Sequence, residues 1–275
     1  MSGYAMPTIL LVNDDGIQSI GLLVIKKRLE KLGEVIVVAP EKERSGIGKA
    51  LTAYEHVKIM ETQLSDGSKA YAITGTPAEA FLLGVNKILK HSPDLVVAGI
   101  NLGPNLGIDD VLNSGTLGAA LEAAIHKVPA IAVSYCVQKI LDRPNWKEKV
   151  TSEELELTAD LAQEAVEYVL KRGMPPDVDI ISVNVPEGVK SRKVKITSLS
   201  YKGYGDIYTK RKEGYKIGGW VLSSYSDEEP GTDVYTVKKE GGISVTPIRV
   251  RFPHCKTALR DLSKALATLW NNNRP

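Results

Sequence analysis

The sequence predicts a three-layer α/β fold whose central sheet is mainly parallel. Short runs of consecutive apolar residues, rich in valine and isoleucine, recur over residues 8–184, and stretches with helical periodicity separate them. Parallel strands buried on both faces read as such runs, and each needs a crossover connection, usually a helix. The alternation stops after this region. We therefore expect an α/β core over residues 1–190 and a C-terminal extension over residues 191–275.

The first part of the core reads as a strand, a helix and a second strand. The first strand is expected over Thr8–Val12 and the helix over about Ile20–Leu32, with Gly33 as its C-cap. Val35–Ala39 is the second strand, and Pro40 ends it. A helix between two apolar runs is typical of strands that pair in parallel.

The next helix carries a complete start signal. It follows a strand over Ala70–Ile73, and Thr76 is expected as its N-cap. Pro77 then occupies the first helical position, and Glu79 completes a capping box with Thr76. Leu95–Ala98 is a further buried strand.

The remaining core repeats the pattern, and the extension departs from it. In the core we expect a helix opened by Ser114, Gly115 and Thr116, a strand over Ala130–Ser134, a long helix over Ser152–Lys171 and a strand over Asp179–Asn184. In the extension we expect strands over Val194–Thr197 and Ile243–Ile248, a tyrosine-rich antiparallel hairpin between them and a terminal helix over Ala258–Trp270. The core is thus a Rossmann-like sheet. Tyr and Trp are common at interfaces, so the extension is expected to complete the site and the oligomer interface.

Composition narrows the class of protein. Apolar residues make up 43% of the 275 residues, and 35 basic residues face 33 acidic ones. This balance predicts no duplex nucleic acid partner and no membrane surface partner. No apolar run approaches the ~20 residues that span a bilayer, and the N-terminus lacks the pattern of a signal peptide. Cys136 and Cys255 are expected as two buried thiols, which fits a cytoplasmic protein.

Two adjacent carboxylates follow the first strand directly. Asp14 and Asp15 stand between Asn13 and Gly16, and ligand sites in open α/β sheets lie outside the carboxyl ends of the strands. Two like charges side by side repel, and a bound cation relieves that repulsion. Oxygen ligands of this kind suit Mg²⁺ or Mn²⁺. A simple turn is the alternative, since these residue types favour turns.

Two further strand ends contribute oxygen ligands to the same edge. Ser45 lies in the loop after the second strand, and Asn101 follows the strand over Leu95–Ala98. Together with Asp14 and Asp15, their side chains suit one hard cation, with water completing its shell. Ser45 is the least expected ligand, because a lone serine in a loop is usually a turn or cap residue.

A second motif suits an anion. Gly103 and Gly107 let backbone N–H groups approach a ligand, and Ser114–Thr116 stands at a helix N-terminus, where unpaired N–H groups favour phosphate. Plain helix capping is the alternative at Ser114–Thr116. A cation site beside an anion site is the layout of metal-assisted phosphoryl hydrolysis. Asp109 and Asp110 are expected as solvated loop charges.

Several familiar active-site motifs are missing from the sequence. There is no P-loop, no GxGxxG after the first strand and no GxSxG nucleophile elbow. The four histidines, His56, His91, His126 and His254, are scattered without an HExxH pair. Phosphate binding by a Walker loop, dinucleotide binding, serine hydrolysis and zinc hydrolysis are therefore unsupported.

At this point the chain resembles the survival protein E (SurE) nucleotidases. The motifs that carry the resemblance occur in order: Asn13–Gly16, Arg44–Gly46, Gly75–Pro77, Gly99–Gly107, Ser114–Thr116, Gly231–Asp233 and Ser244–Pro247. The resemblance implies a metal-dependent hydrolase of phosphoric monoesters. Its expected substrates are nucleoside 5′- and 3′-monophosphates, with short polyphosphate as a further substrate of some members. It also implies association as a homodimer or homotetramer through an exchanged C-terminal segment and an extended hairpin.

The resemblance also assigns roles to residues. It implies one divalent ion per subunit, Mg or Mn, held by Asp14, Asp15, Ser45 and Asn101. Asn105, Ser114, Gly115 and Thr116 would then face the phosphate, and Asp14, Asp15, Asn105 and Ser114 would form the catalytic set. In this hypothesis a metal-activated water attacks phosphorus, and one of the two aspartates accepts its proton. The sequence leaves open which aspartate does so.

Two positions depart from the family pattern, and two other functions stay open. Asn113 and Gly242 stand where the family pattern has aromatic residues, which bears on base stacking and substrate preference. A receiver-like signalling domain also pairs acids after its first strand, but it needs an acceptor aspartate where this chain has Asn101. A nucleotide-binding regulator without catalysis is the other alternative.

Overall fold

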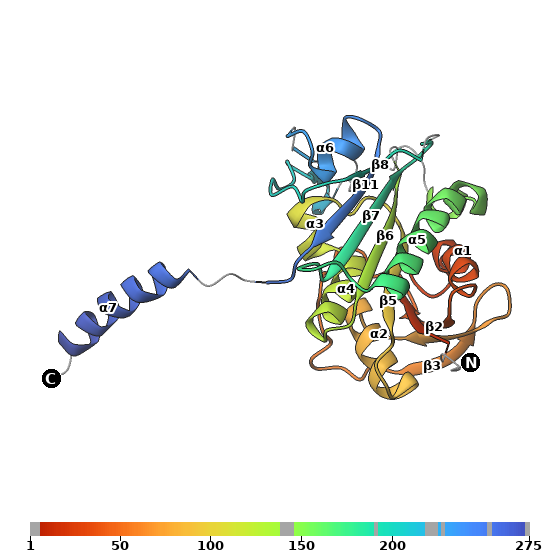
Figure 1. Ribbon diagram of the computed structural model, residues 1–275, viewed down its shortest axis with the longest axis horizontal. Helices are drawn as coiled ribbons and strands as arrows, with labels where there is room; N and C mark the ends of the chain where they lie inside the picture. The colour runs from red at the N-terminus through yellow and green to blue at the C-terminus, as the bar shows by residue number, and fades with distance from the viewer. Residues whose placement is uncertain are drawn as a thin grey trace.

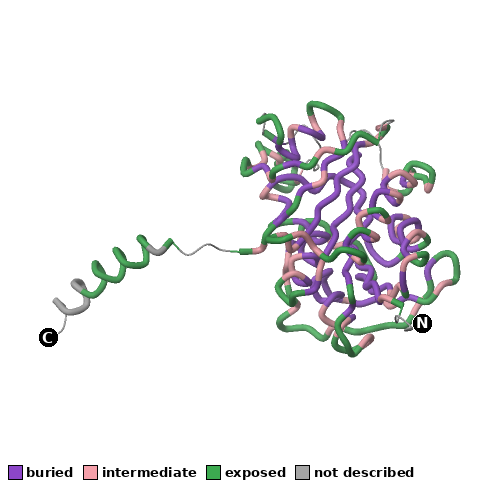
Figure 2. Tube along the Cα trace, viewed as in Figure 1, coloured by how far each residue is buried: buried purple, intermediate pink, exposed green. Residues whose placement is uncertain are grey.

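The computed structural model describes residues 6–137, 146–189, 192–217, 225–226, 229–251 and 255–272. A twisted sheet lies between two layers of helices, with a smaller hairpin and a terminal helix outside this body (Figure 1). Buried residues concentrate in the sheet and on the inner faces of the helices, as the purple segments of Figure 2 show. The three-layer α/β class is confirmed.

The elements have the following bounds. The strands are β1 (Thr8–Val12), β2 (Glu34–Pro40), β3 (Ile59–Gln63), β4 (Lys69–Ile73), β5 (Leu95–Leu102), β6 (Ala130–Cys136), β7 (Ile180–Pro186), β8 (Val194–Ile196), β9 (Tyr208–Arg211), β10 (Gly214–Ile217) and β11 (Ile243–Ile248). The helices are α1 (Ile20–Leu29), α2 (Pro77–Leu83), the π-helical η1 (Gly84–Leu89), α3 (Gly107–Asn113), α4 (Gly115–Ile125), the 3₁₀ helix η2 (Trp146–Lys149), α5 (Ser152–Arg172), α6 (Asp233–Lys238) and α7 (Lys256–Asn272).

The main sheet has nine strands in the order β3-β4-β2-β1-β5-β6-β7-β11-β8. The six central strands, from β4 to β7, are parallel to one another. Antiparallel pairs occur only towards the edges, where β3 pairs with β4 and β11 pairs with β7. The carboxyl ends of β1, β2 and β5 therefore lie at one edge of the sheet, and this edge carries the site.

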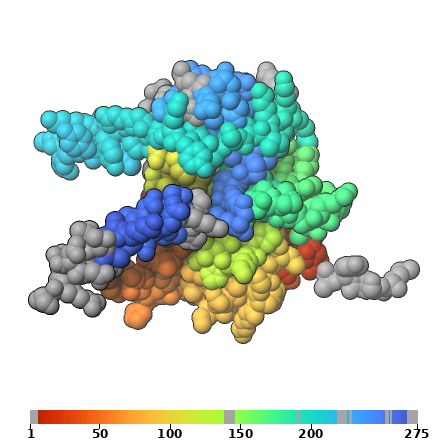
Figure 3. Space-filling model, turned by 60° about the vertical axis from the view of Figure 1, so that its left-hand side comes forward, coloured from red at the N-terminus to blue at the C-terminus, as the bar shows by residue number. Residues whose placement is uncertain are grey.

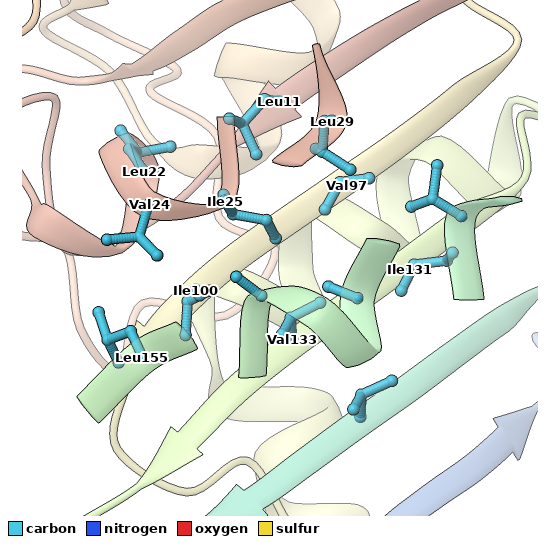
Figure 4. Packing of buried hydrophobic residues seen from close by; sticks show 14 of the residues in the cluster. Leu11, Leu22, Val24, Ile25, Leu29, Val97, Ile100, Ile131, Val133 and Leu155 are labelled. Atoms are coloured by element: carbon cyan, nitrogen blue, oxygen red, sulfur yellow. The ribbon is translucent and has the colours of Figure 1, made fainter. Parts of the chain in front are cut away.

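Both faces of the sheet are buried, which explains the continuous apolar runs. Ile9 and Leu11 pack into one core with α1 and α5, and Leu10 and Val12 pack into another with α2 and α4. Figure 4 shows the first core, where Leu22 and Ile25 of α1 lie over β1 and β5. Successive side chains of a strand point to opposite faces, so the four residues Ile9–Val12 are all apolar.

The helix caps follow the sequence closely. Thr76 and Glu79 form the expected capping box with Pro77 in the first turn, and Ser114 caps α4. The predicted extent of the first helix is wrong, because α1 ends at Leu29 and its C-cap is Glu30. Gly33 serves another purpose: a Cβ there would lie 2.3 Å from the Pro7 carbonyl oxygen, so only glycine permits this close approach.

Four elements were not expected from the sequence, and one of them is the 3₁₀ helix η2. β3 forms an antiparallel edge strand, α3 occupies residues expected as a glycine-rich loop, and α6 follows Thr232. β5 also runs four residues further than its apolar core, to Leu102, so that Asn101 lies inside the strand rather than after it. A register shift between Ala98 and Asn101 in the pairing with β6 accompanies this extension.

The C-terminal region has two structural roles. β8 and β11 extend the main sheet, whereas β9 and β10 form the expected antiparallel hairpin, which projects from the body (Figure 3). The division at residue 190 remains a prediction.

Both cysteines are free, but only Cys136 is buried; Cys255 is exposed because it lies beside α7, which stands away from the body. In the described ranges, none of the helices combines the length and apolarity needed to traverse a bilayer.

Helix α1 approaches β5 so closely that one position must be glycine. A Cβ on Gly21 would lie 2.1 Å from the Ile100 carbonyl oxygen. We expect Gly21→Ala to lower the free energy of unfolding by about 1–3 kcal/mol, because the helix must shift out of a packed core. Urea denaturation measures this. The control Lys27→Ala, on the exposed face of α1, should stay near the wild-type stability. Equal stability of the two variants would show that α1 does not depend on this approach.

Candidate functional site

The site begins where β1 ends. Asn13 and Asp14 are buried, and the Asn13 amide donates a hydrogen bond to the Gly16 carbonyl, closing a tight turn in which Gly16 has a φ of +100°. The Asp14 carbonyl accepts a hydrogen bond of 2.7 Å from the Arg44 N–H, which fixes the loop after β2 against the end of β1. The segment Asn13–Gly16 is therefore both a turn, as the alternative interpretation predicted, and part of the site, because the turn positions the two carboxylates.

Asp14 faces the N-terminus of α4. Its Oδ1 accepts a 2.5 Å hydrogen bond from Thr116 Oγ1. Gly115 permits this approach, because a Cβ there would lie 2.7 Å from Asp14 Cβ. Burial raises the pKa of Asp14 to about 7, and the neighbouring charge of Asp15 adds to the rise, against the Thr116 hydrogen bond.

Asp15 turns to the other side of the strand. Its Oδ2 accepts a 2.8 Å hydrogen bond from the Leu102 N–H, and its Oδ1 forms an ion pair with Lys147. Burial raises the pKa of Asp15, although the Lys147 charge opposes the rise. Lys147 also pairs with Glu43. Burial acts to raise the pKa of Glu43, but hydrogen bonds from Lys147 and Ser45 outweigh it and leave that pKa lowered.

A cavity of about 200 Å³ gathers most of the predicted site residues. Its lining consists of Asp14, Glu43, Ser45, Gly46, Asn101, Leu102, Gly103, Pro104, Asn105, Asp110, Asn113, Ser114, Trp146 and Lys147. Asp15 instead lines an adjoining cavity of about 330 Å³, and Lys147 borders both. Gly115 and Thr116 are buried behind Asp14 and do not reach the cavity wall.

The donor set suits a hard divalent cation. Asp14, Asp15, Ser45 and Asn101 offer only oxygen atoms, apart from the Asn101 amide nitrogen, which is engaged with the Gly103 carbonyl at 2.9 Å. Two buried carboxylates with raised pKa values need positive charge near them. Over the described ranges, no three His, Cys, Asp or Glu side chains cluster for metal binding. A metal ion here therefore depends on the neutral oxygens of Ser45 and Asn101 and on water.

Asn105 also lines the cavity, and hydrogen bonds hold its backbone and its side chain. Its backbone N–H donates to Asn184 Oδ1 at 3.0 Å, and Asn184 Nδ2 donates back to the Asn105 carbonyl at 2.9 Å. Its side-chain amide donates to Ser134 Oγ at 2.9 Å. The sequence did not single out Ser134 and Asn184 for the site. Their positions in the sequence could have indicated a role in the site, because Ser134 and Asn184 each end an expected strand at the edge of the sheet where Asp14 lies.

No sequence pattern predicts the three other cavity residues Glu43, Trp146 and Lys147. Glu43 lies in an irregular loop, and Trp146 and Lys147 form η2, which follows no apolar periodicity. Glu43 and Lys147 meet in an ion pair that no local sequence pattern indicates. The Lys147 ammonium lies 5.7 Å from the centre of the Trp146 ring.

The expectation that Asp110 is a solvated charge is wrong. It lies in α3 and is only 4% exposed. The Leu106 N–H donates to its Oδ2 at 2.6 Å, the Tyr225 hydroxyl donates at 2.5 Å, and the Tyr204 hydroxyl donates to its Oδ1. Burial raises the pKa of Asp110 to about 8 despite these donors, helped by the nearby charge of Asp233. The carboxyl thus ties α3 to the C-terminal extension.

Fold and site together define a class of protein. Proteins of this class have a parallel sheet covered by helices on both faces, and paired aspartates at the end of one strand lie beside the N-terminus of a helix. This arrangement is typical of enzymes that act on phosphate groups. The model of the family described as Survival protein SurE matches residues 9–206, and the chain belongs to that family. The resemblance drawn from the ordered motifs is therefore confirmed.

Similar proteins cover most of the chain. It is 40% identical over 204 residues to the 5′-nucleotidase SurE of Methanothermobacter thermautotrophicus, which covers 74% of this chain and 77% of that protein. It is also 40% identical over 252 residues to the 5′-nucleotidase SurE of Methanothrix thermoacetophila, covering 89% and 93%. The crystal structure of the SurE protein from Aquifex aeolicus is similar with a TM-score of 0.73 and 33% identity, covering 94% of this chain and 100% of that one.

The Asp110 carboxyl predicts a pH dependence of stability. Its pKa is about 8 in the folded protein and near 3.8 when unfolded, so the folded state binds the proton more tightly. Its contribution to stability is full below pH 3.8 and is lost as the pH rises to about 8, by at most ~1.4 kcal/mol per pH unit. We expect Asp110→Asn to flatten the decline between pH 5 and 8, measured by urea unfolding. The control Asp206→Asn, at an exposed carboxylate, should keep the wild-type slope; an equal slope in all three proteins would contradict this role.

Proposed function

We propose that this protein is a metal-dependent phosphomonoesterase that hydrolyses nucleoside monophosphates to nucleoside and phosphate. One observation carries the proposal: two adjacent carboxylates are buried at the end of β1, and one of them contacts the N-terminus of α4. This arrangement supports a cation site and an anion site at one edge of the sheet. The relatives named 5′-nucleotidase SurE support the same reaction class.

Asp14, Asp15, Ser45 and Asn101 are the residues that would hold one divalent ion, Mg or Mn. Such an ion supplies charge that neutralises the phosphoryl group and lowers the pKa of water. Asp14, Ser45 and Asn101 border one cavity, and Asp15 lines the adjoining one. The Ser45 hydroxyl donates to Glu43 at 2.6 Å, which leaves its oxygen lone pairs available.

The chain itself would bind the phosphate and move one proton. Asn105 and Ser114 line the cavity, and the positive end of the α4 dipole, which begins at Ser114, would stabilise the charge that develops on phosphate. Asp14 is the better candidate to accept the proton of the attacking water. It faces the cavity, whereas both oxygens of Asp15 are engaged with Leu102 and Lys147.

The proposal extends to the substrates, the location and the oligomeric state of the protein. The 5′- and 3′-monophosphates are both proposed substrates, with short polyphosphate as a third, in a cytoplasmic protein. The alternatives of a receiver-like domain or a non-catalytic nucleotide-binding regulator are not favoured by the nucleotidase relatives. A homodimer or homotetramer is supported by α7, whose residues Leu259, Leu262 and Leu266 form an exposed apolar stripe.

Removal of either carboxylate charge tests the reaction directly. We expect Asp14→Asn and Asp15→Asn each to lower phosphate release from nucleoside monophosphates at least about 100-fold, because the cation loses a ligand in both variants and the water also loses its base in Asp14→Asn. EDTA should have the same effect on the wild type, and added Mg²⁺ or Mn²⁺ should reverse it. Phosphate release is measured colorimetrically and folding by circular dichroism. The control Asp66→Asn, in an exposed turn, should retain full activity. Unchanged activity in a folded Asp14→Asn or Asp15→Asn protein would refute the assignment.

Asn184 provides a second test, through the position of Asn105. Asn184→Ala removes the two hydrogen bonds that the Asn184 side chain exchanges with the backbone N–H and carbonyl of Asn105. We expect kcat for phosphate release to fall about 10-fold or more, because Asn105 loses its fixed place relative to the reacting phosphate. The comparison variant Asn86→Ala removes an exposed asparagine bonded only to the Leu82 carbonyl and should leave kcat unchanged. A wild-type kcat in Asn184→Ala would mean that Asn105 needs no such support.

A further inference from the structure

The size of the cavity limits how much of a nucleotide it encloses. Ligand pockets commonly measure about 300–1,000 Å³ and bury most of the ligand. The cavity beside Asp14 measures about 200 Å³. Phosphate must approach Asn105 and Ser114, so the phosphate and part of the sugar use this volume. The base of the nucleotide therefore lies at the rim, where it needs a contact of its own.

Trp146 is the aromatic side chain available at that rim. Within the described part of the lining, it is the only aromatic residue. Its side chain is half-buried and packs against the core formed by α1, α5 and the sheet. A ring held in this way loses little conformational freedom when a planar ligand stacks on it. The rest of the described lining offers carboxylates, amides, hydroxyls, glycine backbone, the Lys147 ammonium group and the aliphatic side chains of Leu102 and Pro104, and none of these is an aromatic ring.

Lys147 fixes the place of Trp146 relative to the reacting end of the site. Its ammonium group pairs with Asp15, which follows β1, and with Glu43, which follows β2. The Lys147 side chain is only 26% exposed, so these contacts are partly shielded from solvent. η2 has four residues and no buried residue of its own, which makes the two ion pairs its main polar attachment to this edge.

We propose that Trp146 is the residue on which the base of the substrate stacks, and that Lys147 is the positioning residue that holds η2 at the cavity. This rests on the proposed nucleotidase function and adds the recognition of the base. Stacking uses the face that every base possesses, so it gives tolerance for different bases. Purines cover more of an indole ring than pyrimidines, so a preference for purine nucleotides follows.

The test compares a nucleotide with a substrate that lacks a base. In Trp146→Ala we expect KM for adenosine monophosphate to rise roughly 10-fold or more, with KM for ribose 5-phosphate unchanged within about two-fold. Trp146→Phe should restore most of the affinity for the nucleotide. The matched control Tyr54→Ala removes a fully exposed aromatic residue and should leave both KM values at the wild-type level.

The role of Lys147 has its own readout. Lys147→Met should raise the ratio of KM for adenosine monophosphate to KM for ribose 5-phosphate, because Trp146 is no longer held at the rim. Lys147→Arg keeps the charge and should restore the ratio. Lys149→Met, an exposed lysine of the same 3₁₀ helix, is the control and should keep the wild-type ratio.

The outcomes separate this inference from the proposed function. If the wild type hydrolyses adenosine monophosphate and Trp146→Ala leaves the KM ratio unchanged, base stacking on Trp146 is refuted while the function stands. If no ester is hydrolysed, the proposed function fails. The stacking is then tested by calorimetric titration with a non-hydrolysable phosphonate analogue of adenosine monophosphate. Weaker binding by Trp146→Ala than by the wild type supports the inference, and equal or undetectable binding by both overturns it.

Discussion

The site depends on the burial of two adjacent carboxylates at the end of β1. Asp14 and Asp15 lose water, and each keeps the few hydrogen bonds that its own side of the strand provides. Burial and mutual repulsion raise the pKa of Asp14, so the pair is held at an electrostatic cost. The fold can hold the pair because β1 is an interior strand of a sheet buried on both faces, and its end cannot move without disturbing two cores.

Close backbone packing makes this arrangement possible. α4 reaches Asp14 because Gly115 has no side chain, and α1 reaches β5 because Gly21 has none. The two helices approach the same edge of the sheet from opposite faces. Asn184 performs a similar task by exchanging two hydrogen bonds with the Asn105 backbone. The geometry of the site is thus set by residues that cannot themselves react with a phosphate ester.

The sequence predicts the parts of this protein that repeat a physical pattern. Strands buried on both faces give apolar runs, and a capping box gives the start of α2, so these patterns locate most of the core. β3 is mostly exposed and lacks such a run, and α3 is a seven-residue helix within a glycine-rich segment. Asp14 and Asp15 could be predicted as a pair, but not the separate cavities that they line. That separation arises because the turn after β1 directs Asp14 towards Thr116 of α4 and Asp15 towards the Leu102 N–H and Lys147. Lys147 comes from an aperiodic segment, and no local pattern brings it to Asp15.

The charges at the site argue for a cation beyond Lys147. Asp14, Asp15 and Glu43 can carry three negative charges, and Lys147, the only basic side chain among the described residues of either cavity, supplies one positive charge. A phosphate monoester brings up to two more negative charges, while the N-terminus of α4 offers the equivalent of only about half a positive charge. Protonation of Asp14 is one way to reduce the excess, and its raised pKa reflects this. A proton on Asp14 would leave that carboxyl unable to serve as a base. A divalent cation removes the same excess and leaves both carboxylates ionised, which is the condition that hydrolysis at this site requires.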